Sequence, residues 1–391
     1  MTTRISRRKS LGIGMGTALF TGLGLSASGL KASEHTCDPH YCPGRLGDAS
    51  MSLKTDPRAD PRMVAALAEF ALDELAPAPA VTADSPLDEI LDFITAAEKE
   101  YQKIFDEWFS SLPPVENVQR RTEVIQGVDG NEIRLFIHEP TTASARRPCI
   151  FHIHGGGMVL LTARDSVYVR WRDELAAVGL TVVGVDFRNG GGTLGNHPFP
   201  AGLNDCMSGL QWTAQNRAAL GASSVVVSGD SGGGNLSLAL TLKCLKDGRL
   251  DWVDGTYAMC PYISNRYGRK TPELPSLYEN DDYFVSCRMM GAFALAYDPE
   301  CENAENPLCW PYYAKASDLH KLPPHVISLN ELDPLRDEGL AYYRKLMQAG
   351  VVATSRTVNG TCHAADELFR SACPDIYQST IRDIRRFAES L

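Results

Sequence analysis

From residue 122 onward the chain alternates between short β-rich runs and helical stretches, and this alternation restricts the fold more than any other feature. The β-rich runs span residues 122–126, 132–138, 149–154, 181–186, 224–228, 254–259, 325–330 and 353–358. Helical stretches such as 166–178, 235–246 and 338–349 separate them. We therefore predict an α/β fold with a mostly parallel sheet, right-handed crossovers and helices on both faces. Catalytic groups should collect where the strands end.

Two further segments complete the predicted organisation of the chain. Apolar residues recur at helical spacing over residues 61–75 and 87–112, which predicts two amphipathic helices. We interpret the aromatic stripe of the second helix as core packing. Residues 261–310 interrupt the alternation with many Pro, Asn, Tyr and Asp residues, so we expect an insertion over the sheet edge.

The first 32 residues have the pattern of an export signal. Arg7 and Arg8 precede a glycine-rich apolar run, and no acidic residue occurs before Glu34. The pattern resembles a twin-arginine signal, which predicts a periplasmic or secreted protein. Cleavage is favoured over a retained anchor because glycines weaken the run as a membrane span, and the cleaved protein would have no stable membrane association. Residues 33–60 are expected to be a mobile linker.

Composition and charge narrow the class of protein. The chain has 44% apolar and 22% charged residues, which is typical of a soluble globular protein. Its net charge is -10, and loss of the signal's basic residues would take it to -15. Nucleic acid is therefore not a favoured partner. The odd number of cysteines, eleven, does not indicate a disulfide framework, and Cys37 and Cys42 lack a second ligand pair, so we predict no metal.

A G-x-S-x-G sequence follows the β-rich run 224–228. Gly229 and Gly233 flank Ser231, and a helical stretch begins at Asn235. A sharp turn from strand to helix needs residues without Cβ around the serine, because its hydroxyl must project clear of the sheet. The placement predicts a nucleophile elbow with Ser231 as nucleophile.

Three glycines, Gly155, Gly156 and Gly157, follow another strand. Backbone N–H groups of such a loop can turn toward a developing oxyanion. We expect His154 to support this loop by hydrogen bonding, because it precedes Ser231 and the elbow order requires serine, then acid, then histidine.

That order leaves His363 as the general base by elimination. Asp333 lies in the turn after the run 325–330, just before a proline, so its carboxylate can orient an imidazole from the next loop. Asp337 and Glu338 are expected only to complement the dipole of a new helix.

One glycine motif has to be set aside. Residues 190–195 match G-x-G-x-x-G, which by itself would suggest a dinucleotide site. The sequence His197-Pro198-Phe199-Pro200 follows and cannot open the phosphate-binding helix of that fingerprint, so we predict a loop.

Taken together, these motifs resemble the hormone-sensitive-lipase branch of the α/β-hydrolases, from about residue 60 to the end. The resemblance is carried by residues 154–157, 186–189, 197–200, 229–235, 274–277 and 330–339. The chain departs from that branch at Gly232, where alanine is typical, and after Arg188, where Asn189-Gly190-Gly191 replaces Leu-Ala-Pro.

The resemblance implies a catalytic domain over residues 116–391, with a helical cap segment over residues 61–115. It implies a serine carboxylic ester hydrolase in which Ser231, His363 and Asp333 form the triad and no cofactor is needed. The N–H groups of Gly155, Gly156 and Gly232 would form the oxyanion hole. The expected binding partner is a small-molecule ester, which is the substrate. Whether the chain forms a homodimer is left open.

Residues expected to line a partly enclosed hydrophobic pocket are Met158, Tyr283 and Phe284. Such a pocket favours short or compact esters as substrates, and macrocyclic lactones are further candidate substrates. Two alternatives remain open at this point: a hydrolase-fold small-molecule receptor without catalysis, and lactonase or amidase activity on the same triad.

Overall fold

The computed structural model describes residues 44–142, 146–269 and 271–391. The predicted export signal, Cys37 and Cys42 lie outside the described residues. Within them, the nine cysteines are free thiols, and no helix is long and apolar enough to cross a membrane.

An eight-stranded sheet forms the centre of the molecule, in the order β1-β2-β4-β3-β5-β6-β7-β8. Strand β2 runs in the opposite direction to the other seven strands, which are parallel to one another. The strands are β1 Val118–Gln126, β2 Glu132–Pro140, β3 Arg147–Ile153, β4 Thr181–Asp186, β5 Ala222–Asp230, β6 Gly255–Met259, β7 His325–Asn330 and β8 Ala353–Val358. This is the mostly parallel sheet that the alternation predicts, and it fits the α/β-hydrolase fold that the resemblance implies.

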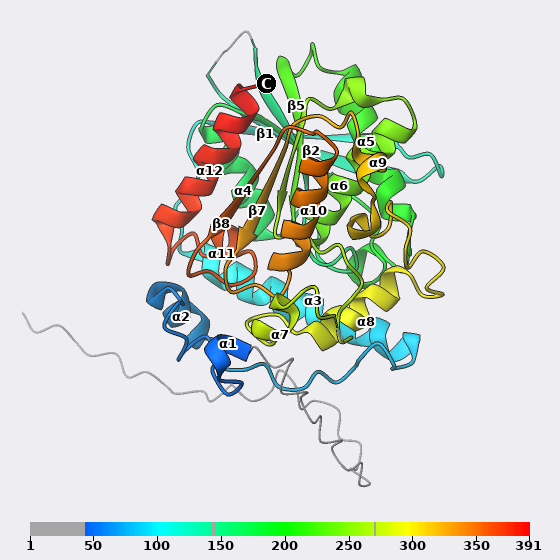
Figure 1. Ribbon diagram of the computed structural model, residues 1–391. Helices are drawn as coiled ribbons and strands as arrows, with labels where there is room; N and C mark the ends of the chain where they lie inside the picture. Colours follow the sequence, from blue (N-terminus) through cyan, green and yellow to red (C-terminus); the bar gives the residue numbers. More distant parts are fainter. Residues whose placement is uncertain (1–43, 143–145, 270) are drawn as a thin grey trace, which may run out of the picture. The chain divides into compact units, whose positions relative to one another are not determined.

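Helices cover both faces of the sheet (Figure 1). Helices α4 and α12 pack on one face, and α5, α6 and α10 pack on the other. The helices are α1 Gly44–Gly47, α2 Pro61–Ala68, α3 Leu87–Ser110, α4 Ser166–Ala177, α5 Ala201–Gln215, α6 Ser231–Lys246, α7 Ser276–Glu279, α8 Cys287–Tyr297, α9 Ala316–Leu319, α10 Arg336–Gln348, α11 Ala365–Leu368 and α12 Pro374–Glu389. Every residue of β4, β6 and β7 is buried, as expected for strands covered on both faces.

The segments outside the alternation gather at one end of the sheet. Helix α3 packs against α8, which belongs to the insertion 261–310, and Figure 1 shows α3, α7 and α8 together at that end. The apolar stripe of α3 is buried, whereas its other face is polar. Helix α2 ends at Ala68, earlier than expected, because Ala71 takes a left-handed conformation and closes the turn.

The second half of the expected mobile linker is packed. Leu53 is fully buried, and Asp56 accepts a hydrogen bond from the Tyr283 hydroxyl at 3.0 Å. Arg58 bridges Asp56 and Glu279, so this stretch is tied to α7. Residues 51–60 therefore do not form a free linker, because a buried apolar side chain and a buried ion pair hold them against the body of the protein.

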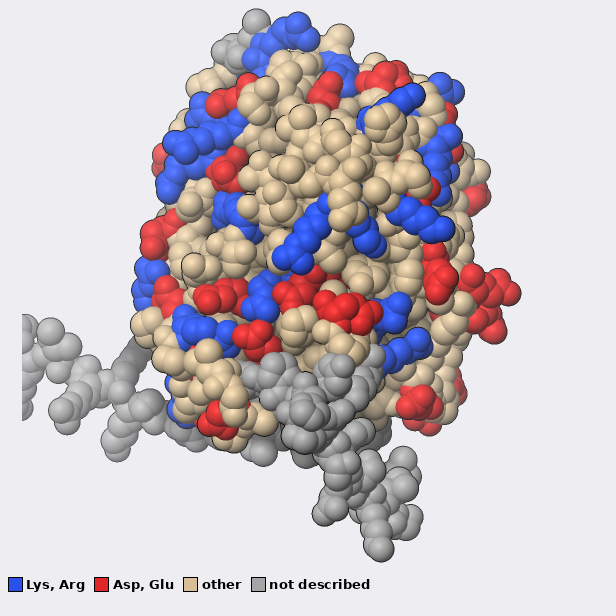
Figure 2. Space-filling view, in the orientation of Figure 1, with Lys and Arg blue, Asp and Glu red and all other residues tan. Residues whose placement is uncertain are grey.

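Acidic and basic side chains are interspersed on the face shown in Figure 2. Among the described residues visible there, we see no extended basic strip of the kind that follows a phosphate backbone.

Candidate active site

The nucleophile elbow forms where β5 meets α6. Ser231 is the first residue of α6 and has a φ of 52°, a left-handed conformation that is strained for a residue with a Cβ. A Cβ at Gly229 or Gly233 would lie 2.3 or 2.1 Å from the carbonyl oxygen of Ile153. Both glycines are therefore required by the close approach of strand β3, as the motif predicts.

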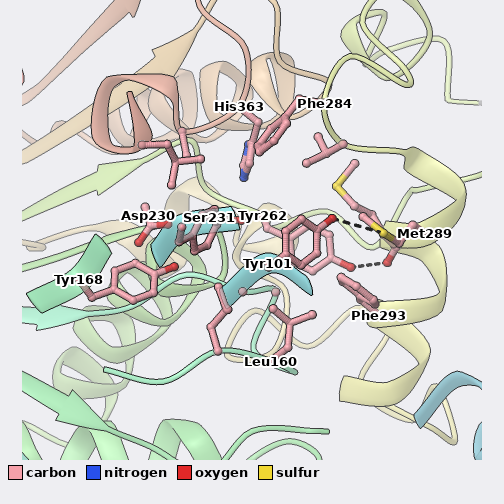
Figure 3. A pocket seen from close by; sticks show the side chains of 18 residues that line it. Tyr101, Leu160, Tyr168, Asp230, Ser231, Tyr262, Phe284, Met289, Phe293 and His363 are labelled. Carbon is pink, nitrogen blue, oxygen red and sulfur yellow. Dashed lines mark hydrogen bonds between the residues drawn. The ribbon is translucent and has the colours of Figure 1, made fainter. Parts of the chain in front are cut away.

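The histidine and the acid come from the loops after β8 and β7. His363 donates a hydrogen bond from Nδ1 to Oδ2 of Asp333 at 2.8 Å, and Asp333 is fully buried. The other carboxylate oxygen accepts the backbone N–H of Leu335 at 2.9 Å. Because the carboxylate holds the proton on Nδ1, Nε2 is left free to accept one. Figure 3 shows the His363 ring pointing into the cavity that Ser231 lines.

The charge of Asp333 tunes this histidine. Burial disfavours the imidazolium, but the charge of Asp333 and its hydrogen bond outweigh burial and raise the pKa of His363 above its ordinary value. His363 is thus a stronger base than a histidine in water. The structure places Ser231 and His363 at one cavity and hydrogen-bonds His363 to Asp333.

The three glycines after β3 do not share one role. Gly156 and Gly157 line the cavity, with φ of 96° and 61°. Gly155 does not line it, and a Cβ there would lie 2.1 Å from the carboxylate of Asp230. Of the three glycines, Gly156 and Gly157 are therefore the two that face the cavity.

Gly232 lies against this loop. A Cβ at Gly232 would lie 2.5 Å from the backbone nitrogen of Met158 and 2.7 Å from that of Gly157. These contacts are with backbone, which cannot easily move aside. Glycine in place of the typical alanine at residue 232 therefore allows the loop to lie this close to the elbow.

His154 supports the loop as expected. It is fully buried, stacks on Phe187 at 4.3 Å between ring centroids, and donates from Nδ1 to the carbonyl oxygen of Gly155 at 2.8 Å. Burial lowers its pKa to about 3, so the ring is neutral.

A cavity of about 90 Å³ opens beside Ser231 and His363. Its walls are mainly apolar and aromatic, and those on one side come from α3, from α8 and from the residues just before α8 (Figure 3). The residues on that side are Tyr101, Phe105, Phe284, Val285, Met289, Met290 and Phe293.

Of the three residues expected in this pocket, only Phe284 lines it. Tyr283 does not line the cavity, and its hydroxyl donates a hydrogen bond to Asp56. Met158 is buried in the loop behind the cavity, and its carbonyl accepts the N–H of Gly190 at 2.8 Å.

Comparisons with known proteins address the family directly. Residues 150–366 match a family model described as alpha/beta hydrolase fold, which is more than half of the chain. The chain belongs to the alpha/beta hydrolase family. A solved structure titled brefeldin A esterase, a bacterial homologue of human hormone sensitive lipase, is 47% identical with a TM-score of 0.86, and the match covers 88% of this chain and 97% of that one. The resemblance to the hormone-sensitive-lipase branch is confirmed.

Named relatives agree on the class of reaction. Carboxylesterase NlhH of Mycobacterium tuberculosis (strain ATCC 25618 / H37Rv) is 32% identical over 247 residues, which are 61% of this chain and 72% of the relative. An arylesterase of Saccharolobus solfataricus is 27% identical over 280 residues, or 70% of this chain and 86% of the relative. This hydrolase is a carboxylesterase.

Sequence reasoning missed a buried polar cluster behind the elbow of this hydrolase. His152, Asp230 and Glu367 each place a ligand-type atom within 4.8 Å of the other two. Both carboxylate oxygens of Glu367 and both ring nitrogens of His152 lack a hydrogen-bond partner among the described residues. Burial raises the pKa of Asp230 to about 7 and raises that of Glu367 well above its usual range. Both shifts favour the uncharged form of these carboxyl groups.

These groups could in principle ligate a divalent cation. The buried Arg172 acts against it, because its positive charge would repel a cation there. Burial and the charge of Arg172 lower the pKa of His152, and the same charge offsets part of the rise in the pKa of Glu367. The motif around Ser231 could have pointed to Asp230, but nothing in the sequence indicates that Glu367 is buried beside it.

Asp337 and Glu338 of the hydrolase do more than complement a helix dipole. Glu338 is buried and accepts hydrogen bonds from the N–H of Ile263 at 2.6 Å, from the Tyr267 hydroxyl at 2.6 Å and from the Ser264 hydroxyl. Asp337 accepts the N–H of Ser276 at 2.7 Å. Both carboxylates therefore anchor the insertion to α10, a tertiary role that the sequence alone does not reveal.

The glycine motif at residues 190–195 forms a loop with a short 3-10 turn over Gly192–Leu194, as predicted. Helix α5 begins only at Ala201. A Cβ at Gly192 would lie 2.8 Å from the Glu98 carboxylate of α3, so this loop packs against the helix.

Proposed function

We propose that Ser231, His363 and Asp333 form the catalytic triad of this carboxylesterase. The observation that carries the proposal is the 2.8 Å hydrogen bond from His363 to the fully buried Asp333, with His363 and Ser231 facing one cavity. Nε2 of His363 accepts the proton of the Ser231 hydroxyl as Oγ attacks the ester carbonyl carbon. The same nitrogen then delivers this proton to the leaving alkoxide, and a water molecule releases the acid from the acyl-enzyme by the reverse roles.

We assign the oxyanion hole to the N–H groups of Gly156, Gly157 and Gly232. The assignment rests on the cavity position of the first two and on the contact of Gly232 with the same loop. Gly155 leaves the set because it does not line the cavity and packs against Asp230. Each well-placed donor is typically worth about 3–4 kcal/mol toward the transition state.

Short or compact esters are the proposed substrates. The cavity is small, and aromatic and methionine side chains close it on the side of α3 and α8. Macrocyclic lactones remain candidates, and the name of the brefeldin A esterase makes brefeldin A the first to test.

The test is a panel of p-nitrophenyl esters of graded acyl length together with brefeldin A, measured on the full chain and on Ser231→Ala. We expect a maximum of kcat/KM at short acyl groups, and a loss of several orders of magnitude in Ser231→Ala with an unchanged unfolding temperature. Near-normal turnover by a folded Ser231→Ala variant would refute the triad. A maximum at long acyl chains would refute the substrate class alone.

A further inference from the structure

Helix α3 carries one buried carboxylate in the middle of its apolar stripe. Glu98 is 1% exposed. Its Oε1 accepts the backbone N–H of Leu161 at 2.8 Å, and its Oε2 accepts the N–H and the hydroxyl of Thr193 at 2.7 and 2.6 Å. No basic side chain lies within 4.0 Å of this carboxylate in the part of the chain that the structure describes, so hydrogen bonds alone compensate its burial.

These hydrogen bonds end on two loops that the cavity depends on. Leu161 closes the loop that begins with the oxyanion glycines, and Thr193 belongs to the glycine loop at residues 190–195. The two loops are also joined directly, because the side-chain amide of Asn189 donates to the carbonyl of Leu161 at 2.8 Å and the N–H of Gly190 donates to that of Met158. One carboxylate therefore links the cap helix to both loops at once.

The oxyanion loop needs such a restraint. Met158 and Leu161 have φ of 62° and 72°, although neither is glycine. A left-handed non-glycine residue costs about 1–3 kcal/mol and persists only when its surroundings hold it. Within the loop, the N–H of Leu160 bonds back to the carbonyl of Gly156 at 3.1 Å, so the position of Leu161 is coupled to the turn that aims Gly156 and Gly157.

Packing alone does not explain an acid at this position. The neighbouring buried residues of the stripe, Ile90, Ile94 and Phe105, are apolar, and an apolar side chain at residue 98 would avoid burying a charge. The glycine loop approaches this carboxylate closely, because Gly192 has a φ of 63° and a Cβ there would lie 2.8 Å from Oε1.

We infer that Glu98 is a positioning residue for ester hydrolysis, which holds the oxyanion loop from the cap helix so that the N–H groups of Gly156 and Gly157 stay aimed at the oxyanion. The inference rests on the proposed oxyanion hole. It makes α3 a fixed part of the catalytic machinery as well as a wall of the cavity.

The test compares Glu98→Gln with Glu100→Gln. Glu100 is exposed on the same helix, so the matched control makes the same chemical change without touching a loop. In Glu98→Gln one oxygen becomes an amide group, which must face a backbone N–H and loses that hydrogen bond. We expect Glu98→Gln to lower kcat by about 10- to 100-fold with KM changed less than about threefold, because a displaced oxyanion donor weakens the transition state and not the bound ester. Glu100→Gln should match the parent in both constants.

An alkylboronic acid supplies a readout that loss of stability would not change. It forms a tetrahedral adduct with Ser231, so its inhibition constant should rise in Glu98→Gln by about the factor by which kcat/KM falls. If kcat falls without any change in boronic acid affinity, Glu98 acts on overall integrity and the inference is wrong. Parent-like kcat in Glu98→Gln would also refute it.

Two further variants keep the test decisive. If Glu98→Gln does not fold, Thr193→Val removes only the 2.6 Å hydroxyl bond, and we expect a 2- to 10-fold loss of kcat; no loss would refute the inference. Ser231→Ala is measured in parallel. If Ser231→Ala retains turnover, the proposed triad fails. If Ser231→Ala is inactive and Glu98→Gln has the same kinetic constants as Glu100→Gln, the triad stands and the inference about Glu98 is wrong.

Discussion

Two acids near the end of β7 face different neighbours, and this difference predicts different roles in catalysis. Asp333 contacts the His363 ring and the N–H of Leu335. Asp337 contacts the N–H of Ser276 and the Arg336 side chain, and is part of the anchor of the insertion. Only Asp333 can select the tautomer of the histidine and raise its basicity.

The pH dependence of kcat/KM should report the pKa of His363. The general base must be neutral, so activity falls as pH drops through that pKa, which lies above the ordinary value of 6.5 because of Asp333. Asp333→Asn should move this acid limb to lower pH and lower kcat by about 10⁴-fold through the wrong tautomer. Asp337→Asn should lower kcat less than about tenfold and leave the limb in place. Equal losses of kcat in the two variants, measured on one ester across pH 5–9, would show that the roles are wrongly divided.

At the scale of elements, α8 shapes the cavity. Met289, Met290 and Phe293 face it from this helix, and Phe293 lies close to the oxyanion loop, since a Cβ at Gly157 would lie 3.3 Å from its ring. The helix thus sets the room available to the ester beside the reacting carbonyl.

Phe293→Ala should therefore enlarge the cavity and shift the chain-length preference. A methylene in an apolar pocket is worth about 1–3 kcal/mol, so the ratio of kcat/KM for a hexanoate over an acetate ester should rise about tenfold or more. Arg288→Ala, on the exposed side of α8, is the control and should leave the ratio unchanged. Parallel series with longer acyl and longer alcohol groups show which part of the ester faces α8. An unchanged ratio in both series would remove α8 from the determinants of specificity.

The sequence predicts elements better than contacts in this molecule. The bounds of β4 and β7 coincide with the expected runs, because each is a short β-rich run bounded by turns. The G-x-S-x-G motif selects Ser231, the turn after a strand selects Asp333, and the order along the chain leaves His363 by elimination. The sequence cannot tell which of three adjacent glycines faces the cavity, because that depends on how the loop turns in the folded chain. Nor does it indicate that Glu98 and Glu338 are buried, since acids on amphipathic helices are usually exposed.

At the scale of the whole molecule, the cap is attached to the body by polar contacts as well as by apolar packing. Glu98 binds both loops beside the cavity, and one turn further along α3 the amide of Gln102 donates to Asp165 at 3.0 Å. Glu338 and Asp337 fasten the insertion that carries α8. A lid that opens on contact with a lipid surface would have to break these buried hydrogen bonds, each of which costs about 1–3 kcal/mol when its partner is left unsatisfied.

We therefore predict that the enzyme acts on dissolved esters and shows no jump in rate when the substrate forms an interface. The measurement is the initial rate against concentration for a butyrate ester and a long-chain ester, each taken across its solubility limit. For the butyrate the rate should saturate below that limit and stay level beyond it, because the cavity is already formed and dissolved monomers fill it. The long-chain ester should be hydrolysed slowly on both sides of its limit, because the aromatic walls leave little room for the chain. A steep rise in rate at the limit, or a preference for the emulsified long-chain ester, would mean that the α3 and α8 contacts open at an interface and that the enzyme is a lipase.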